Sequence, residues 1–163
     1  MKNKSNLEQE FISLIKQYER VIYNVCTFYV SETSPLEDLY QEIILNLWKA
    51  FPNFRNESQT STWIYRIALN TCISDLRRNA KFRQNLPLSL SKQIIFEQDT
   101  KSIEIQELYS LIYKLNKIER SIILLWLEEK SYQEIADVTG FSVANVATRL
   151  KRTKEKLKNM SNH

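Results

Sequence analysis

The chain has 163 residues, a net charge of +4, and only one glycine and three prolines. Because β-hairpins and nucleotide-binding loops use glycine for backbone conformations at positive φ, this composition argues against sheet folds and phosphate-cradling loops and predicts an all-α protein. The length suffices for one ordinary hydrophobic core or two small ones.

The residue types that enzymes and metal sites need are scarce. The single histidine, His163, is the last residue, and Cys26 and Cys72 have no CxxC partner and no nearby cluster of ligands. Both cysteines lie in apolar helical stretches, which predicts buried, reduced thiols in a cytoplasmic protein. We therefore predict no enzymatic activity, metal, cofactor or small-molecule substrate. Without a signal peptide or an apolar run of about 18 residues, membrane insertion is not expected.

Residues 1–80 are predicted to form one helical domain, followed by a linker over residues 81–101. Apolar residues at spacings of three and four predict a first helix from about Leu7 to Val30 and a third from about Ser61 to Arg78. The linker contains Pro87 and scattered serines and has no sustained helical periodicity.

The second helix is expected to begin with a local signal. Ser34 is a candidate N-cap, Pro35 fits the first helical position, and Glu37 completes an S-x-x-E capping box. The helix should end near Phe51, because Pro52 follows directly. Its buried face is predicted to consist of eight apolar residues: Leu36, Leu39, Tyr40, Ile43, Ile44, Leu47, Trp48 and Phe51.

The opposite face of this second helix is polar except for one leucine. Asp38, Gln41, Glu42 and Lys49 surround Leu45 there. A single exposed leucine is common on protein surfaces, but a leucine with a polar rim is typical of a small protein-binding patch. We predict a partner interface around Leu45, with a chance surface leucine as the alternative.

A narrow polar stripe runs along the otherwise apolar third helix: Arg66, Asn70, Ser74 and Arg77. Just before it lies a polar loop over residues 53–60, which includes Phe54, Arg55, Asn56 and Ser58. Such a loop and stripe can hold an unstacked nucleic-acid base through stacking and base-edge hydrogen bonds. The spacing equally allows Arg66 to pair with a carboxylate and Asn70 to cap a neighbour, so both interpretations stay open.

Residues 102–163 are predicted to form a second helical domain that contains a helix-turn-helix. Its four helix starts are each marked by a capping side chain: Ser102, Asn116 with Glu119, Ser131 with Glu134, and Ser142. The only glycine, Gly140, lies in the last turn, where two helices at a steep angle need a left-handed residue. Ala136 allows the two helices to approach closely, and Val146 fills the core between them.

The last helix has two different sides when its residues are placed at 100° intervals. The apolar side consists of Val143, Val146, Ala147, Leu150 and Leu157. The other side carries Ala144, Asn145, Thr148 and Arg152, with Arg149 at its edge. Residues 149–158 hold six basic side chains and one acidic one, whereas basic and acidic residues balance over residues 1–78. This pattern fits the major groove of DNA, with an ordinary solvated face as the alternative.

Two segments together resemble sigma factors of the extracytoplasmic-function (ECF) group, in the sigma-70 family. LEDLYQEIILNLWKAF through FRNESQTSTWIYRIALNTCISDLRR looks like sigma region 2, and LNKIERSIILLWLEEKSYQEIADVTGFSVANVATRLKRTKEKL looks like sigma region 4. The resemblance covers nearly the whole chain apart from the first residues and the linker. The order of the two segments at this chain length makes the combination specific.

The resemblance implies a role for three groups of residues. The group that would bind the β′ clamp helices of core RNA polymerase is Asp38, Gln41, Glu42 and Leu45. The group that would capture a flipped base of the −10 element is Arg55, Asn56, Ser58, Arg66 and Asn70. The group that would read the −35 element is Ser142, Ala144, Asn145, Thr148, Arg149 and Arg152. The β flap of the polymerase, promoter DNA and an anti-sigma factor are the further partners that it implies.

The sequence departs from the family pattern at a few of these positions. Asn56 stands where a glycine often follows Phe-Arg, Ala144 and Asn145 stand where threonine is common, and Thr148 stands where serine is common. These departures concern the promoter sequence that is read and leave the class of function unchanged.

We therefore predict a cytoplasmic sigma factor that binds core polymerase, reads −35 and −10 elements and aids strand opening. The main alternative is a polymerase-independent helix-turn-helix regulator that binds operators as a dimer. A second alternative is a helical adaptor that binds only protein.

Overall fold

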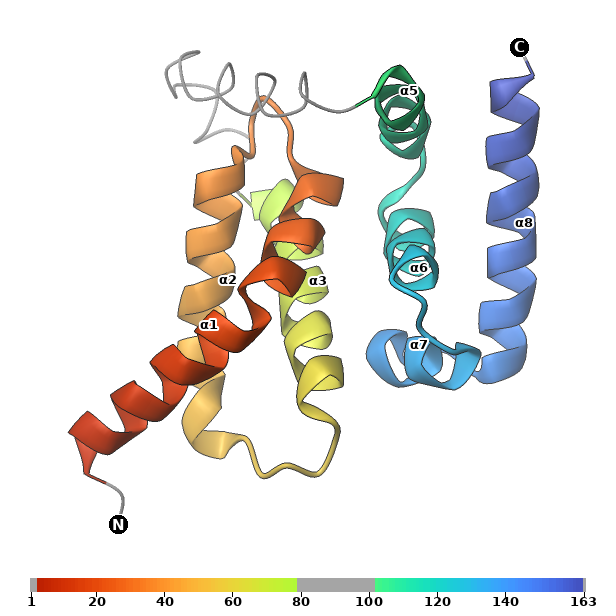
Figure 1. The fold of residues 1–163 in the computed structure, drawn as a ribbon. Helices are drawn as coiled ribbons and strands as arrows, with labels where there is room; N and C mark the ends of the chain where they lie inside the picture. Colours follow the sequence, from red (N-terminus) through yellow and green to blue (C-terminus); the bar gives the residue numbers. More distant parts are fainter. Residues whose placement is uncertain (1–2, 79–101, 163) are drawn as a thin grey trace. The chain divides into compact units, whose positions relative to one another are not determined.

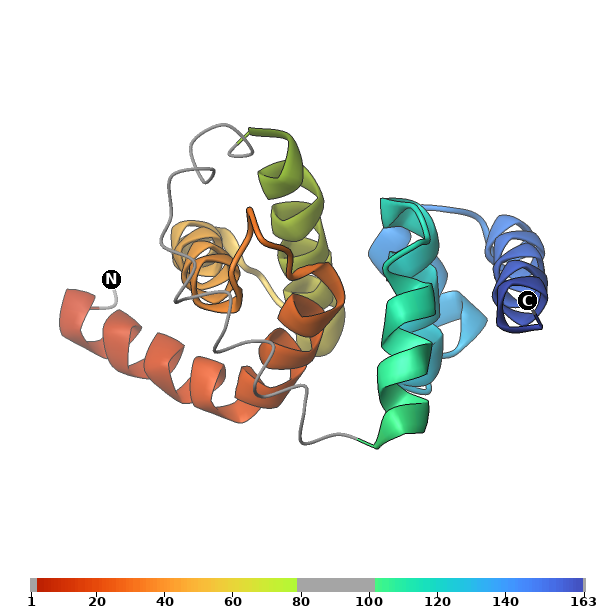
Figure 2. The same cartoon turned by 90° about the horizontal axis from the view of Figure 1, so that it is seen from above.

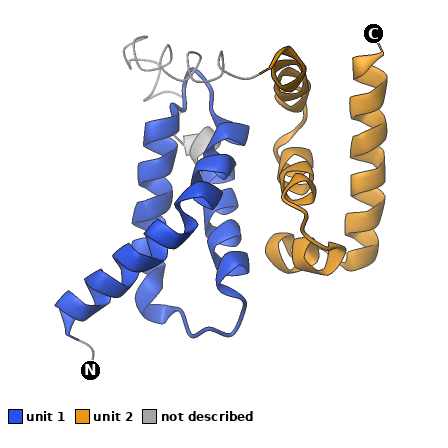
Figure 3. Cartoon of the chain, viewed as in Figure 1, with its two compact units in different colours: residues 1–85 blue, residues 86–163 orange. Residues whose placement is uncertain are grey.

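The computed structural model describes residues 3–78 and 102–162, and the regular elements within these ranges are helices. The chain divides into two compact units, residues 1–85 and 86–163 (Figure 3). The predicted all-α class with two small helical domains is thereby confirmed. The predicted linker at residues 81–101 lies outside the described residues.

Unit 1 contains α1 (Lys4–Tyr29), α2 (Leu36–Ala50), the short 3-10 helix η1 (Phe51–Asn53) and α3 (Thr60–Arg78). The three α-helices pack against one another in pairs, with α1 running obliquely across α2 and α3 (Figure 1). Residues at helical spacing fill the core between them: Ile22, Val25, Leu39, Ile43, Leu47, Ile64, Ala68 and Leu69. Burial of such aliphatic side chains is the main stabilising contribution in a bundle of this size.

The start of α2 differs from the prediction. The helix begins at Leu36 with Pro35 in the N-cap position that was predicted for Ser34, and Pro35 makes no side-chain cap hydrogen bond. Ser34 is buried and pairs instead with Ser31, through backbone hydrogen bonds of 3.0 and 3.1 Å in a tight turn. This turn joins α1 to α2 and moves the helix start one residue along the chain.

Unit 2 contains α5 (Ile103–Ile112), α6 (Lys117–Leu127), α7 (Tyr132–Thr139) and α8 (Val143–Ser161). In Figures 1 and 2, α6 lies alongside α8, and α7 crosses near the beginning of α8. The predicted caps are all present, and those at Asn116 and Ser131 are full capping boxes with Glu119 and Glu134. Each cap satisfies backbone N–H groups that a helix start leaves without partners.

Both cysteines are buried in unit 1 as free thiols, as predicted. Burial raises the pKa of the Cys26 thiol from its ordinary 9.0 to about 12, because a thiolate would lose its hydration there. Among the described residues, no helix combines the length and the apolar character needed to cross a membrane.

Candidate nucleic-acid and protein interfaces

The turn between α7 and α8 sets the direction of α8. Gly140 has φ +84°, a left-handed conformation, and its N–H donates to the Ala136 carbonyl over 2.8 Å. A Cβ at Gly140 would have no atom within 4 Å, so the backbone conformation is what favours glycine here. Two residues later, the Ser142 hydroxyl accepts a hydrogen bond from the Asn145 N–H over 3.1 Å and begins α8.

The core side of α8 is shorter than predicted. Val146 and Leu150 are buried as expected, and Thr153 joins them with its hydroxyl bonded to the Arg149 carbonyl over 2.7 Å. Val143 was predicted on the same apolar side, but 39% of its surface is exposed. Val143 is the first residue of α8, and packing against the other helices covers it less than the turns that follow.

The predicted DNA-reading residues lie together at the exposed beginning of α8. Ser142, Ala144, Asn145, Thr148 and Arg152 are exposed, and Arg149 is half-buried. A short, polar helix face of this kind has the dimensions to enter the major groove, where its amide and guanidinium groups meet base edges. The structure therefore brings the six predicted residues onto one surface, which we name the α8 face.

The second half of α8 is tied to α6 through basic side chains. The Lys156 ammonium group lies 3.1 Å from a Glu119 carboxylate oxygen, and the Lys154 ammonium group lies 4.0 Å from the centroid of the Trp126 ring. Glu119 also accepts from the Asn116 N–H in the α6 capping box. Two of the six basic residues therefore contact α6, while Lys151 and Arg152 are exposed.

The polar-rimmed leucine of α2 is exposed, as predicted. Leu45 shows 45% of its surface, whereas Leu47, two residues later, shows none. Gln41 beside it is exposed, and Asp38 and Glu42 are half-buried. We name these four residues, Asp38, Gln41, Glu42 and Leu45, the α2 face.

The α2 face is held in place by the packing of α2 against α3. The Asn46 amide donates to the Thr71 hydroxyl over 2.9 Å, and that hydroxyl donates to the Ile67 carbonyl over 2.7 Å. A short chain of hydrogen bonds thus fixes α2, next to Leu45, to the backbone of α3.

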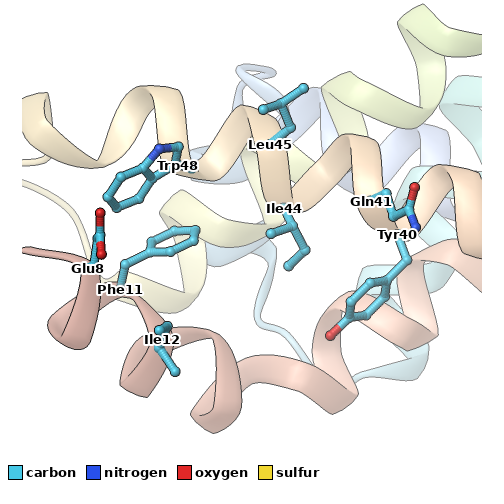
Figure 4. Close-up of a pocket in the computed structure, with 8 residues that line it drawn as sticks. All are labelled: Glu8, Phe11, Ile12, Tyr40, Gln41, Ile44, Leu45 and Trp48. Carbon is cyan, nitrogen blue, oxygen red and sulfur yellow. The ribbon is translucent and has the colours of Figure 1, made fainter.

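An apolar groove between α1 and α2 is the feature that the sequence did not predict. It has a volume of about 690 Å³ and is lined by Glu8, Phe11, Ile12, Tyr40, Gln41, Ile44, Leu45 and Trp48. Figure 4 shows Phe11 facing Trp48 and Ile44 pointing toward α1. Tyr40, Ile44 and Trp48 were predicted as buried, but α1 covers them only in part. In the sequence, the apolar faces of α1 and α2 are wider than the contact between these two helices requires, and this could have predicted a partly open groove.

The loop before α3 is anchored by aromatic stacking. The Phe54 ring stacks on the Trp63 ring with centroids 4.4 Å apart, and Trp63 is buried. Next to this anchor, Arg55 and Asn56 are exposed and Ser58 is half-buried. Asn56 has φ +57°, a conformation that glycine adopts most easily and asparagine next. Asparagine at the position where the family often has glycine is therefore explained by the backbone.

The polar stripe of α3 starts about two turns beyond this loop. Arg66 and Asn70 are both exposed and, four residues apart, share one face of the helix. The loop and the stripe therefore belong to the same element of unit 1, with the loop at the N-terminal end of α3. The loop and the stripe are therefore neighbouring surfaces in the sequence of unit 1.

Two family models match the chain, one in each unit. The model for Sigma-70 region 2 matches residues 14–82, and the model for Sigma-70, region 4 matches residues 105–157. Together they include the α2 face, the loop before α3 and the α8 face.

Curated relatives match over nearly the full length. The chain is 30% identical to RNA polymerase sigma factor SigV of Bacillus subtilis, over 93% of this chain and 91% of that protein. It is 28% identical to RNA polymerase sigma factor YlaC of the same organism, over 97% and 93% of the two chains. It is 26% identical to the ECF RNA polymerase sigma-E factor of Haemophilus influenzae, over 93% of this chain and 87% of that protein.

Solved structures share the fold. A chain in the complex of the sigma factor RpoE with the anti-sigma factor NepR from Bartonella quintana matches with a TM-score of 0.67 and 18% identity, over 96% of this chain and 97% of that one. A chain in the complex of CnrH with the cytosolic domain of CnrY matches with a TM-score of 0.65 and 24% identity. The match covers 95% of this chain and 89% of that one.

Proposed function

This chain belongs to the sigma-70 family of RNA polymerase sigma factors, in its ECF group, and we propose that its two units read the two elements of one promoter. It is an initiation factor that binds RNA polymerase and directs promoter-specific transcription. The observation that carries the proposal is the match of regions 2 and 4, in that order, to two separate helical units. A polymerase-independent operator-binding regulator is not favoured, because region 2 accounts for the first unit.

In the proposed function, unit 2 holds the −35 element as duplex DNA. The α8 face enters the major groove, where Asn145 and Arg149 meet base edges and Lys151 and Arg152 neutralise phosphates. Because each neutralised phosphate releases counterions, binding weakens steeply as the salt concentration rises. The exposure of Ser142, Asn145 and Arg152 on one helix start supports this assignment.

Unit 1 captures an unpaired base of the −10 element in this proposal. Removing a base from the stack costs a few kcal/mol, and the loop with Arg55, Asn56 and Ser58 recovers part of that cost by binding the base. Arg66 and Asn70 bind the same strand further along α3. The Phe54–Trp63 stack supports the proposal because it gives the loop a rigid base next to its exposed polar groups. Strand opening is then favoured by binding, and the chain makes or breaks no covalent bond.

The polymerase contact on unit 1 is assigned to the α2 face. Leu45 supplies a central apolar contact, and Asp38, Gln41 and Glu42 supply a polar rim that pairs with the β′ clamp helices. On unit 2 the partner is the β flap. Since polymerase and promoter DNA are in the cytoplasm, we place the action of the chain there.

A regulatory partner is also proposed, an anti-sigma factor that occupies the apolar groove. Gln41 and Leu45 line the groove and also belong to the α2 face, so a helix of the partner in the groove would compete with polymerase. One of the solved structures of similar fold is a complex of the sigma factor RpoE with the anti-sigma factor NepR, which supports a partner of this class.

The first experiment is transcription in vitro with purified core polymerase, genomic DNA fragments, and the protein added or omitted. Discrete start sites that depend on the protein are expected, and they reveal the −35 and −10 sequences. If no new transcript appears although the protein still binds DNA in a gel shift, the operator-binding regulator becomes the better interpretation.

The assignment of Asn70 is tested on the promoter found in this way. We expect Asn70→Ala to weaken use of the −10 element several-fold while affinity for core polymerase is unchanged, because Asn70 is exposed on α3 and the residues of the α2 face belong to another helix. Equal loss of both activities would contradict the assignment, and Leu45→Ala serves as the opposite control.

A further inference from the structure

The side chain of Arg149 is held on two sides within unit 2. Its guanidinium carbon lies 4.4 Å from the centroid of the Phe141 ring, and its Nε–H donates to the Asn145 Oδ1 atom over 3.0 Å. The first contact places the guanidinium group over the ring, and the second uses its Nε–H. Arg149 is also half-buried, while its neighbours on the α8 face are exposed.

This arrangement determines which guanidinium atoms can meet DNA. With Nε donating to Asn145, the two Nη groups form the remaining donor edge, and they share one plane because the guanidinium group is planar. Two parallel N–H donors in one plane match the O6 and N7 acceptors of guanine in the major groove. A preoriented arginine also loses less side-chain entropy on binding than one that moves freely.

The same short turn that begins α8 also fixes this contact. Phe141 lies between the left-handed Gly140 and the N-cap Ser142, and its N–H donates to the Thr139 hydroxyl over 3.4 Å. Asn145 donates its backbone N–H to Ser142, which leaves its side-chain oxygen for Arg149 one turn later. The positions of both groups that hold Arg149 are thus set by the local geometry of the helix start.

We propose that Phe141 and Asn145 are positioning residues that hold Arg149 as a preformed reader of one guanine in the −35 element. The inference rests on the proposed −35 role of the α8 face and adds to it a residue, Phe141, that touches no base. It also gives Asn145 a second role, holding Arg149, beside the contact with a base edge that is proposed above. Removal of the Phe141 ring should therefore lower base discrimination at one −35 base pair and leave the other base pairs unaffected.

The experiment measures holoenzyme binding to the promoter and to its single-base variants at every −35 position. Arg149→Ala identifies the base pair that depends on Arg149, and guanine is expected there. Phe141→Leu, which keeps apolar volume but removes the ring, should lower discrimination at that same base pair by about two- to fivefold, the value of an exposed cation–π contact. Phe141→Tyr, which keeps the ring, should leave discrimination unchanged.

A double-mutant cycle separates positioning from folding. In the Arg149→Ala background, Phe141→Leu should have no further effect on the base preference. An equal loss at all −35 positions, or the same loss with and without Arg149, would overturn the proposal. If Phe141→Leu lowers the thermal midpoint of the protein, Asn145→Ala in the same two backgrounds decides, because it removes the Nε acceptor and leaves the turn intact.

Failure of the underlying function gives a different result. If Arg149→Ala changes no base preference while transcription still depends on the protein, Arg149 reads no base and the positioning role is wrong. If alanine substitutions at Ser142, Asn145 and Thr148 change no preference either, the proposed −35 role of the α8 face is also wrong. If Arg149→Ala removes one preference and Phe141→Leu does not alter it, only the positioning role is wrong.

Discussion

The α8 face and the α2 face are both exposed helix surfaces, but they are built in different ways. The α8 face follows from a local segment, in which Gly140 makes the turn and Ser142 caps the helix. The α2 face depends on packing, since α2 has no side-chain cap and is held by its buried leucines and by the hydrogen bond from Asn46 to Thr71 on α3. A surface encoded locally is predictable from sequence and sensitive to its turn, whereas a surface encoded by packing is sensitive to the core beneath it.

The largest effect is expected from the core under the α2 face. Leu47→Ala should lower the free energy of unfolding of unit 1 by about 2–5 kcal/mol, because Leu47 is fully buried and truncation leaves a cavity. Labelling of the Cys26 and Cys72 thiols in increasing urea measures this, since both thiols are buried in unit 1.

The matched control is Leu45→Ala, two residues away on the same helix. Its effect on stability should stay within about 0.5 kcal/mol, as for most exposed positions, while affinity for core polymerase falls. A stability loss at Leu45 equal to that at Leu47, or unchanged polymerase affinity, would contradict the distinction between face and core.

The turn before α8 should give the next largest effect. Gly140→Ala is expected to cost about 1–2 kcal/mol, the usual penalty of a left-handed conformation with a Cβ, and to weaken −35 binding by redirecting α8. Urea unfolding and binding of a −35 variant series measure the two consequences. Gly140→Asn should lose less stability and less −35 affinity than Gly140→Ala, because asparagine tolerates this conformation. Full stability and full −35 affinity in Gly140→Ala would show that the turn does not set the direction of α8.

Alkaline pH should destabilise unit 1 through Cys26. The folded thiol has a pKa of about 12, raised from 9.0, so its contribution to stability is complete below pH 9 and is lost as pH rises toward 12. At pH 10, one unit above the ordinary pKa, the loss from this one group is about 1 kcal/mol. Chemical unfolding from pH 8 to 10.5 should show a smaller decline in Cys26→Ala than in the native chain. Identical declines would mean that Cys26 ionises equally easily in both states.

The smallest effect concerns the loop before α3, where a local conformation again matters. Asn56→Gly should raise stability by a few tenths of a kcal/mol, and Asn56→Ala should lower it by about 1 kcal/mol, because Asn56 has φ +57°. Measuring the use of the −10 element by both variants distinguishes the effect of the Asn56 backbone conformation from the effect of its side chain. If Asn56→Gly retains use of the −10 element, the role of Asn56 is conformational. If both variants lose use of the −10 element equally, the Asn56 amide binds the base.

The difference between the two units also explains which predictions from sequence succeeded. The helix starts of unit 2 were predicted to the residue, because a capping side chain and the backbone N–H that donates to it lie within four positions of each other. The same type of signal at Ser34 was misleading, because a tight turn with Ser31 uses Ser34 differently. The exposure of Leu45 was predicted from periodicity. An α-helix repeats about every 3.6 residues, so a residue that does not fall on the apolar face points outward.

The sequence by itself determined the helical class, the two domains, the helix-turn-helix and the residues that share each exposed face, because these follow from glycine content, periodicity and local caps. Only the tertiary structure decided how far α1 covers Tyr40, Ile44 and Trp48, and so left an apolar groove open. It also decided the left-handed backbone at Asn56 and the stacking of Arg149 on Phe141. These features depend on distances between side chains in three dimensions, which the spacing of residues along one helix does not specify.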